Sequence, residues 1–211
     1  MEERIEVFKE MFMRPHSPFL TELEKEALSD RVPIIRKDTQ SFLRFLLNLR
    51  KPERILEIGT AVGFSAIMMA ENTEESCIID TIENYEKRIP VAAENIKKSG
   101  YEKRITLFEG DAAEVLKTLK EPYDFIFMDA AKGQYPVFFN NMEHLIKKGT
   151  VIVTDNIFQD GDMIESKYAV RRRDRTIHKR MRDYLYDISQ KKDYETDILP
   201  IGDGLSLMVK K

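Results

Sequence analysis

The sequence predicts an α/β protein built on a mainly parallel β-sheet, and two patterns carry this prediction. From Arg54 onward, short apolar and β-branched runs alternate with longer segments of helical periodicity, which is typical of repeated βαβ units. Two runs near the C-terminus are separated only by Gly202-Asp203-Gly204, which predicts a hairpin and antiparallel final strands. We expect strands at residues 54–58, 77–82, 105–108, 123–128, 150–154, 194–200 and 205–210.

Residues 1–50 have a different pattern. Apolar residues recur there at helical spacing, and prolines divide the region into about three helices. A length of 211 residues is that of one domain. We therefore expect a single domain over residues 1–211, with a helical extension over 1–50 and an α/β core over 51–211.

Composition and charge exclude several classes of protein. Hydrophobic residues make up 42% of the chain and charged residues 34%, as in a folded, soluble protein rather than a disordered one. The net charge of −3 predicts no general attraction to nucleic acid, so any basic surface must be local. The chain has one cysteine, which excludes an internal disulfide and zinc sites with several thiolates. This residue, Cys77, lies in an apolar run and is expected in the core. No apolar stretch approaches the roughly 20 residues that cross a bilayer, and the charged N-terminus is unlike a signal peptide, so we expect a cytoplasmic protein.

The first expected strand ends in a loop with two glycines, ahead of an expected helix. Ligands of doubly wound sheets bind at the carboxyl ends of strands, where glycines let the backbone turn tightly and approach the ligand. The Gly-x-x-x-Gly spacing lacks a glycine of the dinucleotide pattern, which disfavours a pyrophosphate but not a ligand without phosphates. Taken alone, the loop is also compatible with an ordinary strand-to-helix turn. Its candidate residues are Glu57, Gly59, Thr60, Gly63 and Ser65.

Acidic residues follow the next two expected strands. Glu83 comes roughly 20 residues after the glycines, where a carboxylate accepts hydrogen bonds from ribose hydroxyls. The alternative is a solvated carboxylate that opens the helix expected over 85–99. Asp111, beside Ala112, is a candidate to face an adenine ring, but a role as the cap of the following helix would also explain it.

Oxygen donors follow the fourth and fifth expected strands: Asp129 after one, and Asp155 with Asn156 after the other. Both strands are apolar, so we expect both ends to emerge at the same edge of the sheet as the glycine loop. Two carboxylates and an amide offer only hard oxygen ligands, which suit Mg²⁺ with its remaining positions left to water or substrate. Lys132 is close enough in sequence to reach the same place. The alternative is turn formation, because Asp and Asn are common at strand ends.

Taken together, these motifs resemble those of the catechol and caffeoyl-CoA type of S-adenosylmethionine-dependent O-methyltransferases. The resemblance covers about residues 33–211 and is carried by the glycine loop, Glu83, Gly110-Asp111-Ala112, Asp129-Ala130-x-Lys132-x-x-Tyr135 and Thr154-Asp155-Asn156. It implies a Rossmann-like, seven-stranded sheet with an antiparallel last strand.

The resemblance also implies roles for the candidate residues. S-adenosylmethionine would be held by Glu57, Gly59, Thr60, Gly63, Ser65, Glu83, Asp111, Ala112 and Asp129. Mg²⁺ or another divalent cation would be held by Asp129, Asp155 and Asn156, with Asp129 and Lys132 as catalytic residues and Lys132 as the base. A homodimer is expected, because the family is commonly dimeric and the apolar faces of the N-terminal helices exceed what the edge of one sheet needs.

A basic segment follows the fifth expected strand of this otherwise acidic chain. Its arginines include Arg171, Arg172, Arg173 and Arg175. Such a cluster beside an active site suits a polyanionic substrate, because contacts to phosphates position it. The alternative is an exposed helix face that is balanced by nearby aspartates.

The basic segment, the short N-terminal helices and the length are most similar to the bacterial branch of the family that methylates 5-hydroxyuridine at the wobble position of tRNA. The expected reaction is therefore conversion of this base to 5-methoxyuridine, in an anticodon loop that is accessible without opening a duplex. Because the chain lacks tryptophan, stacking on the base would fall to Tyr135, Phe158 or Tyr168. The main alternative is an O-methyltransferase for small catechols or phenylpropanoids. A nicotinamide oxidoreductase is disfavoured by the glycine spacing, and a non-catalytic adapter that retains the fold is a further alternative.

Overall fold

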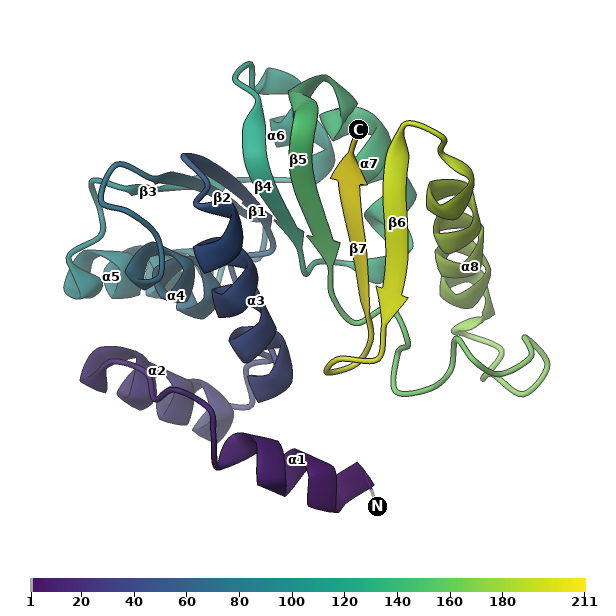
Figure 1. The fold of residues 1–211 in the computed structure, drawn as a ribbon, viewed down its shortest axis with the longest axis horizontal. Helices are drawn as coiled ribbons and strands as arrows, with labels where there is room; N and C mark the ends of the chain where they lie inside the picture. Colours follow the sequence, from purple (N-terminus) through teal and green to yellow (C-terminus); the bar gives the residue numbers. More distant parts are fainter. Residues whose placement is uncertain (1) are drawn as a thin grey trace.

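The computed structural model describes residues 2–211, except for the side chains of Glu2, Glu3, Glu6 and Lys132. The strands are β1 (Arg54–Ile58), β2 (Ile78–Glu83), β3 (Ile105–Glu109), β4 (Tyr123–Met128), β5 (Ile146–Thr154), β6 (Tyr194–Leu199) and β7 (Leu205–Lys210). They form a seven-stranded sheet in the order β3-β2-β1-β4-β5-β7-β6 (Figure 1). The prediction of a Rossmann-like α/β fold with a mostly parallel sheet is confirmed.

Helices precede the sheet and connect its strands. They are α1 (Glu2–Glu10), α2 (Pro18–Ser29), α3 (Lys37–Arg50), α4 (Phe64–Glu71), α5 (Ile89–Ser99), α6 (Ala112–Thr118), α7 (Tyr135–Met142) and α8 (Arg175–Gln190), with the 3₁₀ turns η1 (Lys132–Gln134) and η2 (Glu143–Leu145). The predicted division of the N-terminal region into three helices is confirmed. At the start of α2, Ser17 accepts a hydrogen bond from the backbone N–H of Leu20 and Pro18 opens the first turn, both of which favour a helix start.

The strand order reverses in the middle of the sheet. β1 pairs in parallel with β2 on one side and with β4 on the other. The chain first moves outward from β1 to β3 and then returns to β4, so a switch point lies between the carboxyl ends of β1 and β4. Doubly wound sheets bind their ligands at such a point. β7 is antiparallel to β5 and β6, as the predicted hairpin requires.

The sheet separates two hydrophobic clusters, one on each face. In β4, Phe125 and Phe127 pack in the cluster that also holds residues of α2, α3 and α4. Ile126 and Met128 pack in the cluster formed with α6, α7 and α8. Strands that are covered on both faces are apolar throughout, which explains the nearly continuous hydrophobic runs in the sequence.

Two element boundaries differ from the expected ones by four residues, and the other strand boundaries differ by at most one. The helix expected from Tyr85 begins at Ile89, because the backbone N–H groups of Asn84 and Tyr85 donate to the Glu83 carboxylate in a turn that precedes the helix. β5 begins at Ile146 rather than at residue 150, because its pairing with β4 continues beyond a register shift near Tyr123.

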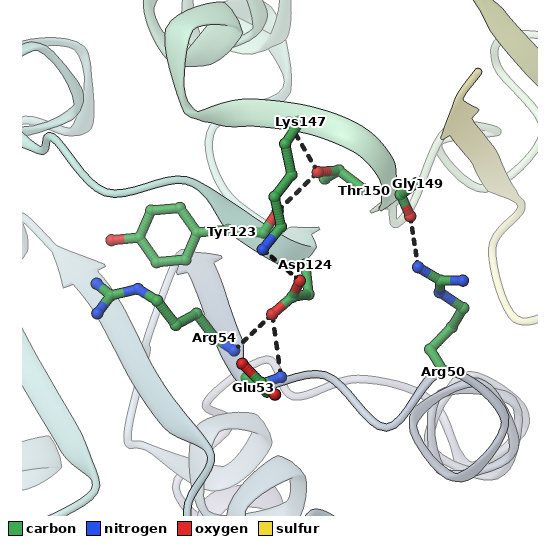
Figure 2. A network of polar contacts seen from close by, with 8 residues as sticks. All are labelled: Arg50, Glu53, Arg54, Tyr123, Asp124, Lys147, Gly149 and Thr150. Atoms are coloured by element: carbon green, nitrogen blue, oxygen red, sulfur yellow. Dashed lines mark hydrogen bonds and ion pairs between the residues drawn. The ribbon is translucent and has the colours of Figure 1, made fainter.

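A polar network fixes the amino edge of the sheet, where the strands begin (Figure 2). Asp124 accepts hydrogen bonds from the backbone N–H groups of Glu53 and Arg54, both at 3.0 Å, and forms an ion pair with Lys147 at 2.6 Å. Burial alone would raise the pKa of Asp124, but the Lys147 ammonium and the two N–H groups outweigh it, so this pKa lies below its usual value. Charged groups at this edge are therefore paired with one another and with the backbone.

The N-terminal helix is placed differently from the other helices. Figure 1 shows α1 at the periphery, away from the sheet. An ion pair between Lys9 and Asp38 connects it to α3. Across residues 2–211, no helix combines the length and the apolar character that are needed to cross a membrane.

Candidate active site

A cavity of about 580 Å³ opens at the carboxyl edge of the sheet. It is lined by residues that follow successive strands: Gly59 and Thr60 after β1, Glu83, Asn84 and Tyr85 around the end of β2, Gly110, Asp111 and Ala112 after β3, Asp129 and Ala130 after β4, and Asn156 after β5. The structure therefore brings most of the predicted cofactor and metal residues to one place. A cavity of this size fits a cofactor or small ligand.

A steric constraint explains why position 59 is a glycine. Gly59 has a φ of +105°, and a Cβ built on it would overlap the backbone carbonyl oxygen of Asp129. Only glycine tolerates both this dihedral angle and this close approach. The loop after β1 is thereby pressed directly against the loop after β4. Gly63, with a φ of +88°, is the N-cap of α4 and does not line the cavity.

Glu83 connects the glycine loop to the end of β2. Its carboxylate accepts hydrogen bonds from the backbone N–H groups of Ala61 at 2.8 Å and of Asn84 and Tyr85 at 2.9 Å. The side chain is buried and lines the cavity, so the alternative of a solvated carboxylate is wrong. The position at the cavity wall is compatible with the predicted contact to ribose hydroxyls.

Asp111 caps a helix and also lies at the cavity wall. Its Oδ1 accepts a hydrogen bond from the backbone N–H of Ala113 at 2.8 Å, which caps α6. Asp111 and Ala112 also line the cavity, as the predicted adenine contact requires.

Glu57 lies behind the cavity wall rather than on it. It is fully buried and accepts a hydrogen bond from the Thr81 hydroxyl at 2.5 Å, and Thr81 in turn is 2.6 Å from the Thr60 hydroxyl. Burial raises the pKa of Glu57 to about 7, although hydrogen bonds from Ser65 and Thr81 lower it. Any influence of Glu57 on a bound cofactor would pass through Thr60 or Ser65, which do line the cavity.

The candidate metal ligands follow β4 and β5, two strands that remain paired as far as their last residues. Met128 of β4 is opposite Thr154 of β5, and the backbone N–H of Asp155 donates to the Met128 carbonyl at 2.9 Å. Asp129 and Asp155 therefore come at equivalent positions on neighbouring strands. Asn156 adopts a φ of +56°, and its N–H donates to Asp155 Oδ1 at 2.6 Å.

The donor set fits a hard divalent cation that keeps solvent or substrate ligands. Within the described part of the chain, no group of three or more His, Cys, Asp and Glu side chains is arranged to hold a metal ion. A site here would therefore consist of the two carboxylates of Asp129 and Asp155 and the amide oxygen of Asn156. Mg²⁺ is commonly bound by one or two carboxylates with its other positions left to water and substrate oxygens. Lys132, the predicted base, belongs to η1, but its side chain lies outside the described residues.

One of the three predicted stacking residues is placed elsewhere. Tyr135 is fully buried, so the expectation that it stacks on a substrate base is wrong. Its hydroxyl lies 3.2 Å from the carbonyl oxygen of Asp155 and 3.4 Å from that of Ala130. Tyr168 is 75% exposed, with Lys167 and Arg175 placed over its ring, and it remains available for stacking.

The predicted basic segment lies beside the cavity without lining it. Arg171, Arg172 and Arg173 are exposed. Arg175 is half-buried, and its guanidinium donates to the carbonyl oxygens of Val170 and Tyr168, both at 3.2 Å, so it holds its own loop. The start of α8 packs on η1, the turn that follows Asp129. The helix that follows the three exposed arginines therefore contacts the site region, while the arginines themselves do not line the cavity.

Sequence reasoning missed the residues at the mouth of the cavity. Arg36 Nη2 and Asp160 Oδ1 form an ion pair at 2.7 Å, and the backbone N–H of Asp160 donates to Asp203 Oδ1 at 2.8 Å. All three residues line the cavity. They come from the start of α3, the loop after β5 and the β6–β7 turn, so no local motif could have connected them.

The fold and the cavity together define a class of protein, the methyltransferases with a Rossmann-like domain. An SAH-bound methyltransferase structure from Podospora anserina is 26% identical and superposes with a TM-score of 0.90, covering 100% of this chain and 95% of that chain. An O-methyltransferase structure from Bacillus cereus in complex with SAH is 25% identical, with a TM-score of 0.86 and coverage of 99% and 97%.

The sequence comparisons identify the family. Residues 10–211 match the O-methyltransferase family model, so the chain belongs to this family. Caffeoyl-CoA O-methyltransferase 2 of Populus trichocarpa is 31% identical over 184 residues, which is 81% of this chain and 72% of that protein. A catechol O-methyltransferase of Niastella koreensis is 35% identical over 128 residues, or 59% of this chain and only 58% of the relative. The chain is an S-adenosylmethionine-dependent O-methyltransferase, which sets aside the oxidoreductase and adapter alternatives.

Proposed function

We propose that this enzyme methylates one of two adjacent oxygens on an acceptor that is held by a divalent cation, most simply Mg²⁺. The observation that carries the proposal is the placement of Asp129 and Asp155 directly after the equivalent ends of the paired strands β4 and β5. Asp129 and Asn156 line the cavity, and Asp155 is buried beside Asn156. Two neighbouring carboxylates beside an electrophilic methyl group suit a chelated acceptor better than an isolated hydroxyl. When bound there, a cation would lower the pKa of the acceptor hydroxyl and orient it.

The protein's own residues have three tasks in this reaction. The glycine loop and Glu83 would hold the cofactor in the cavity. Apolar residues such as Ile58 and Phe138 line the same cavity and limit water. Lys132, as a neutral amine beside the bound cation, would accept the proton of the acceptor hydroxyl and become an ammonium ion. As the new C–O bond forms, the C–S bond breaks and its electron pair stays on sulfur, which becomes a neutral thioether.

Two acceptor classes satisfy this geometry, and different observations favour them. The relatives named for catechol and caffeoyl-CoA favour a small catechol or phenylpropanoid acceptor. In both, adjacent oxygens on an aromatic ring would reach the cation together.

The surface of this chain favours the second acceptor, 5-hydroxyuridine at the tRNA wobble position. Its O5 and O4 are adjacent and would chelate a cation in the same way. Arg171, Arg172 and Arg173 are exposed next to the site, where they suit contacts to the phosphates of an anticodon stem-loop. The exposed ring of Tyr168 offers a stacking surface in the same region.

A direct comparison of acceptors tests the proposal. Purified protein would be given labelled S-adenosylmethionine and either catechol, caffeoyl-CoA or tRNA from cells that lack the gene, with Mg²⁺ or with excess chelator. We expect transfer to at least one acceptor, and its loss in chelator. Full transfer in chelator contradicts the cation, and transfer to none of the three contradicts the acceptor class.

The variant R171Q/R172Q/R173Q separates the two acceptors. If tRNA is the substrate, the variant should raise the KM for tRNA and flatten its salt dependence, because each lost phosphate contact reduces the salt slope. Methylation of catechol should stay unchanged. Unchanged kinetics with tRNA would contradict a role of the basic segment in binding tRNA.

We also propose a homodimer that covers the exposed apolar side chains of α1 and of the turn that follows it. Phe8, Met11 and Phe12 are between 61% and 75% exposed, and a helix of nine residues is unstable without packing. A second copy of the chain would bury these side chains. Sedimentation at micromolar concentration should give the mass of a dimer, and the variant F8E/F12E that of a monomer. A monomeric wild-type protein would contradict this proposal.

A further inference from the structure

The buried hydroxyl of Tyr135 lies between two loops that matter for the site. The residue opens α7, its ring is fully buried, and it packs against Tyr184 with ring centroids 5.9 Å apart. A phenylalanine would fill almost the same space. The hydroxyl therefore needs a separate explanation, because a buried polar group is costly unless it is hydrogen-bonded.

Its partners are the backbone carbonyls of the two ligand-bearing loops. The Tyr135 hydroxyl donates toward the carbonyl oxygen of Asp155 at 3.2 Å and toward that of Ala130 at 3.4 Å. A phenol has one proton, so the two carbonyls share it. One carbonyl belongs to a candidate metal ligand itself, and the other to the residue directly after the candidate ligand Asp129.

This contact joins the loops beyond the point where strand pairing stops. The last backbone hydrogen bond of the β4–β5 ladder runs from the Asp155 N–H to the Met128 carbonyl. Beyond it the chain turns away, since Asn156 adopts the left-handed region with a φ of +56°. The Tyr135 hydroxyl adds one more connection between the two strand ends, made by a side chain instead of the ladder.

We propose that Tyr135 is a positioning residue that fixes the separation of the Asp129 and Asp155 loops, and so sets the affinity for the divalent cation. This inference rests on the proposed function, because it assumes that these loops bind the cation. The residue touches neither cofactor nor acceptor. It acts through the backbone of the residues that do, as partners of metal ligands commonly do.

The structure provides a matched control in Tyr184. This side chain is also buried, belongs to the same aromatic cluster, and has its hydroxyl 3.1 Å from the side-chain oxygen of Thr154. Tyr184→Phe removes a buried hydroxyl at the same place in the core, but it leaves the carbonyls of Ala130 and Asp155 untouched. A purely structural role of the hydroxyl would give both variants the same behaviour.

The test compares Tyr135→Phe, Tyr184→Phe and wild type by calorimetric titration with Mg²⁺ in the presence of S-adenosylhomocysteine. We expect Tyr135→Phe to raise the Kd for Mg²⁺ by about 10-fold or more. The Kd for S-adenosylhomocysteine should change less than about 2-fold, and Tyr184→Phe should bind Mg²⁺ like wild type. In turnover, Tyr135→Phe should show a raised KM for Mg²⁺ with kcat largely recovered at saturating Mg²⁺, which a misfolded fraction would not do.

Each contrary outcome has its own meaning. An unchanged Kd for Mg²⁺ in Tyr135→Phe, or an equal rise in Tyr184→Phe, overturns the positioning role while the proposed function stands. A wild-type protein that binds no Mg²⁺ and turns over fully in chelator overturns the proposed function, and the positioning role with it.

Discussion

The two edges of the sheet carry similar acidic side chains in different surroundings. At the amino edge, Asp124 is held by Lys147 and two backbone N–H groups, and Asp80 by Arg54 at 3.0 Å and by the Tyr123 hydroxyl at 2.6 Å (Figure 2 shows the Asp124 part). At the carboxyl edge, acidic residues border a cavity. The comparison teaches that acidic residues on the same strands are neutralised where cations of the chain surround them, and remain beside open space where the fold leaves room for a ligand.

The largest difference between the two edges is expected when carboxylates are removed from the opposite ends of β4. We expect Asp129→Ala to reduce turnover by about 1,000-fold or more, because a metal-bound transition state loses a ligand worth several kcal/mol. Asp155→Ala should behave in the same way. Asp124→Ala is the matched control at the other end of the strand and should keep the turnover of wild type per folded molecule. Steady-state kinetics together with thermal unfolding check this, and equal losses of turnover in both Asp124→Ala and Asp129→Ala would contradict it.

A second variant tests stability at the amino edge. Asp80→Ala leaves Arg54 and the buried Tyr123 hydroxyl without their common partner, and we expect a loss of about 3 kcal/mol in the free energy of unfolding. For a chain of this size, that corresponds to a fall in Tm of about 6–12 °C. Asp80→Asn keeps an acceptor for Tyr123 and should cost less. Unfolding curves that coincide with that of wild type would mean that this network does not stabilise the fold.

Glu57 sharpens the comparison, because it is an acidic residue of the carboxyl edge with no cation beside it. Its pKa is about 7 in the folded protein and 4.5 as the reference value, so the folded state holds its proton more tightly. Stability from this group is full below about pH 4.5 and is lost as the pH rises through about 7. Relative to wild type, Glu57→Gln should therefore gain about 2–3 kcal/mol between pH 5 and pH 8, measured by urea unfolding in metal-free buffer. A difference that does not depend on pH would contradict the raised pKa.

The positions of the strands along the chain and the residues at their ends could be predicted from the sequence, because both depend on local patterns. Apolar runs separated by helical segments gave the parallel sheet, and a polar residue after each run gave Glu83, Asp129 and Asp155 as residues of the carboxyl edge. All three positions follow from chain order once the sheet is parallel. The direction in which each side chain points does not follow from chain order. The Glu57 side chain illustrates this, because it lies behind the cavity wall and accepts a hydrogen bond from Thr81.

Contacts between distant segments could not be predicted in the same way. The pairing of Arg36 with Asp160 joins residues that are separated by most of the sheet in sequence, and neither belongs to a motif. Tyr135 belongs to a motif, but its burial depends on packing against Tyr184 of α8. Such features arise from tertiary packing, which residue spacing along the chain does not encode.

The direct contact of Gly59 with the Asp129 backbone has a consequence for how this enzyme can change. Because main chain rests on main chain there, the spacing between the loops after β1 and β4 is set by the backbone and leaves little freedom for substitution at position 59. New acceptors would have to be accommodated at the outer rim, around Arg36 and Asp160, where exposed side chains can be exchanged without moving the reaction centre.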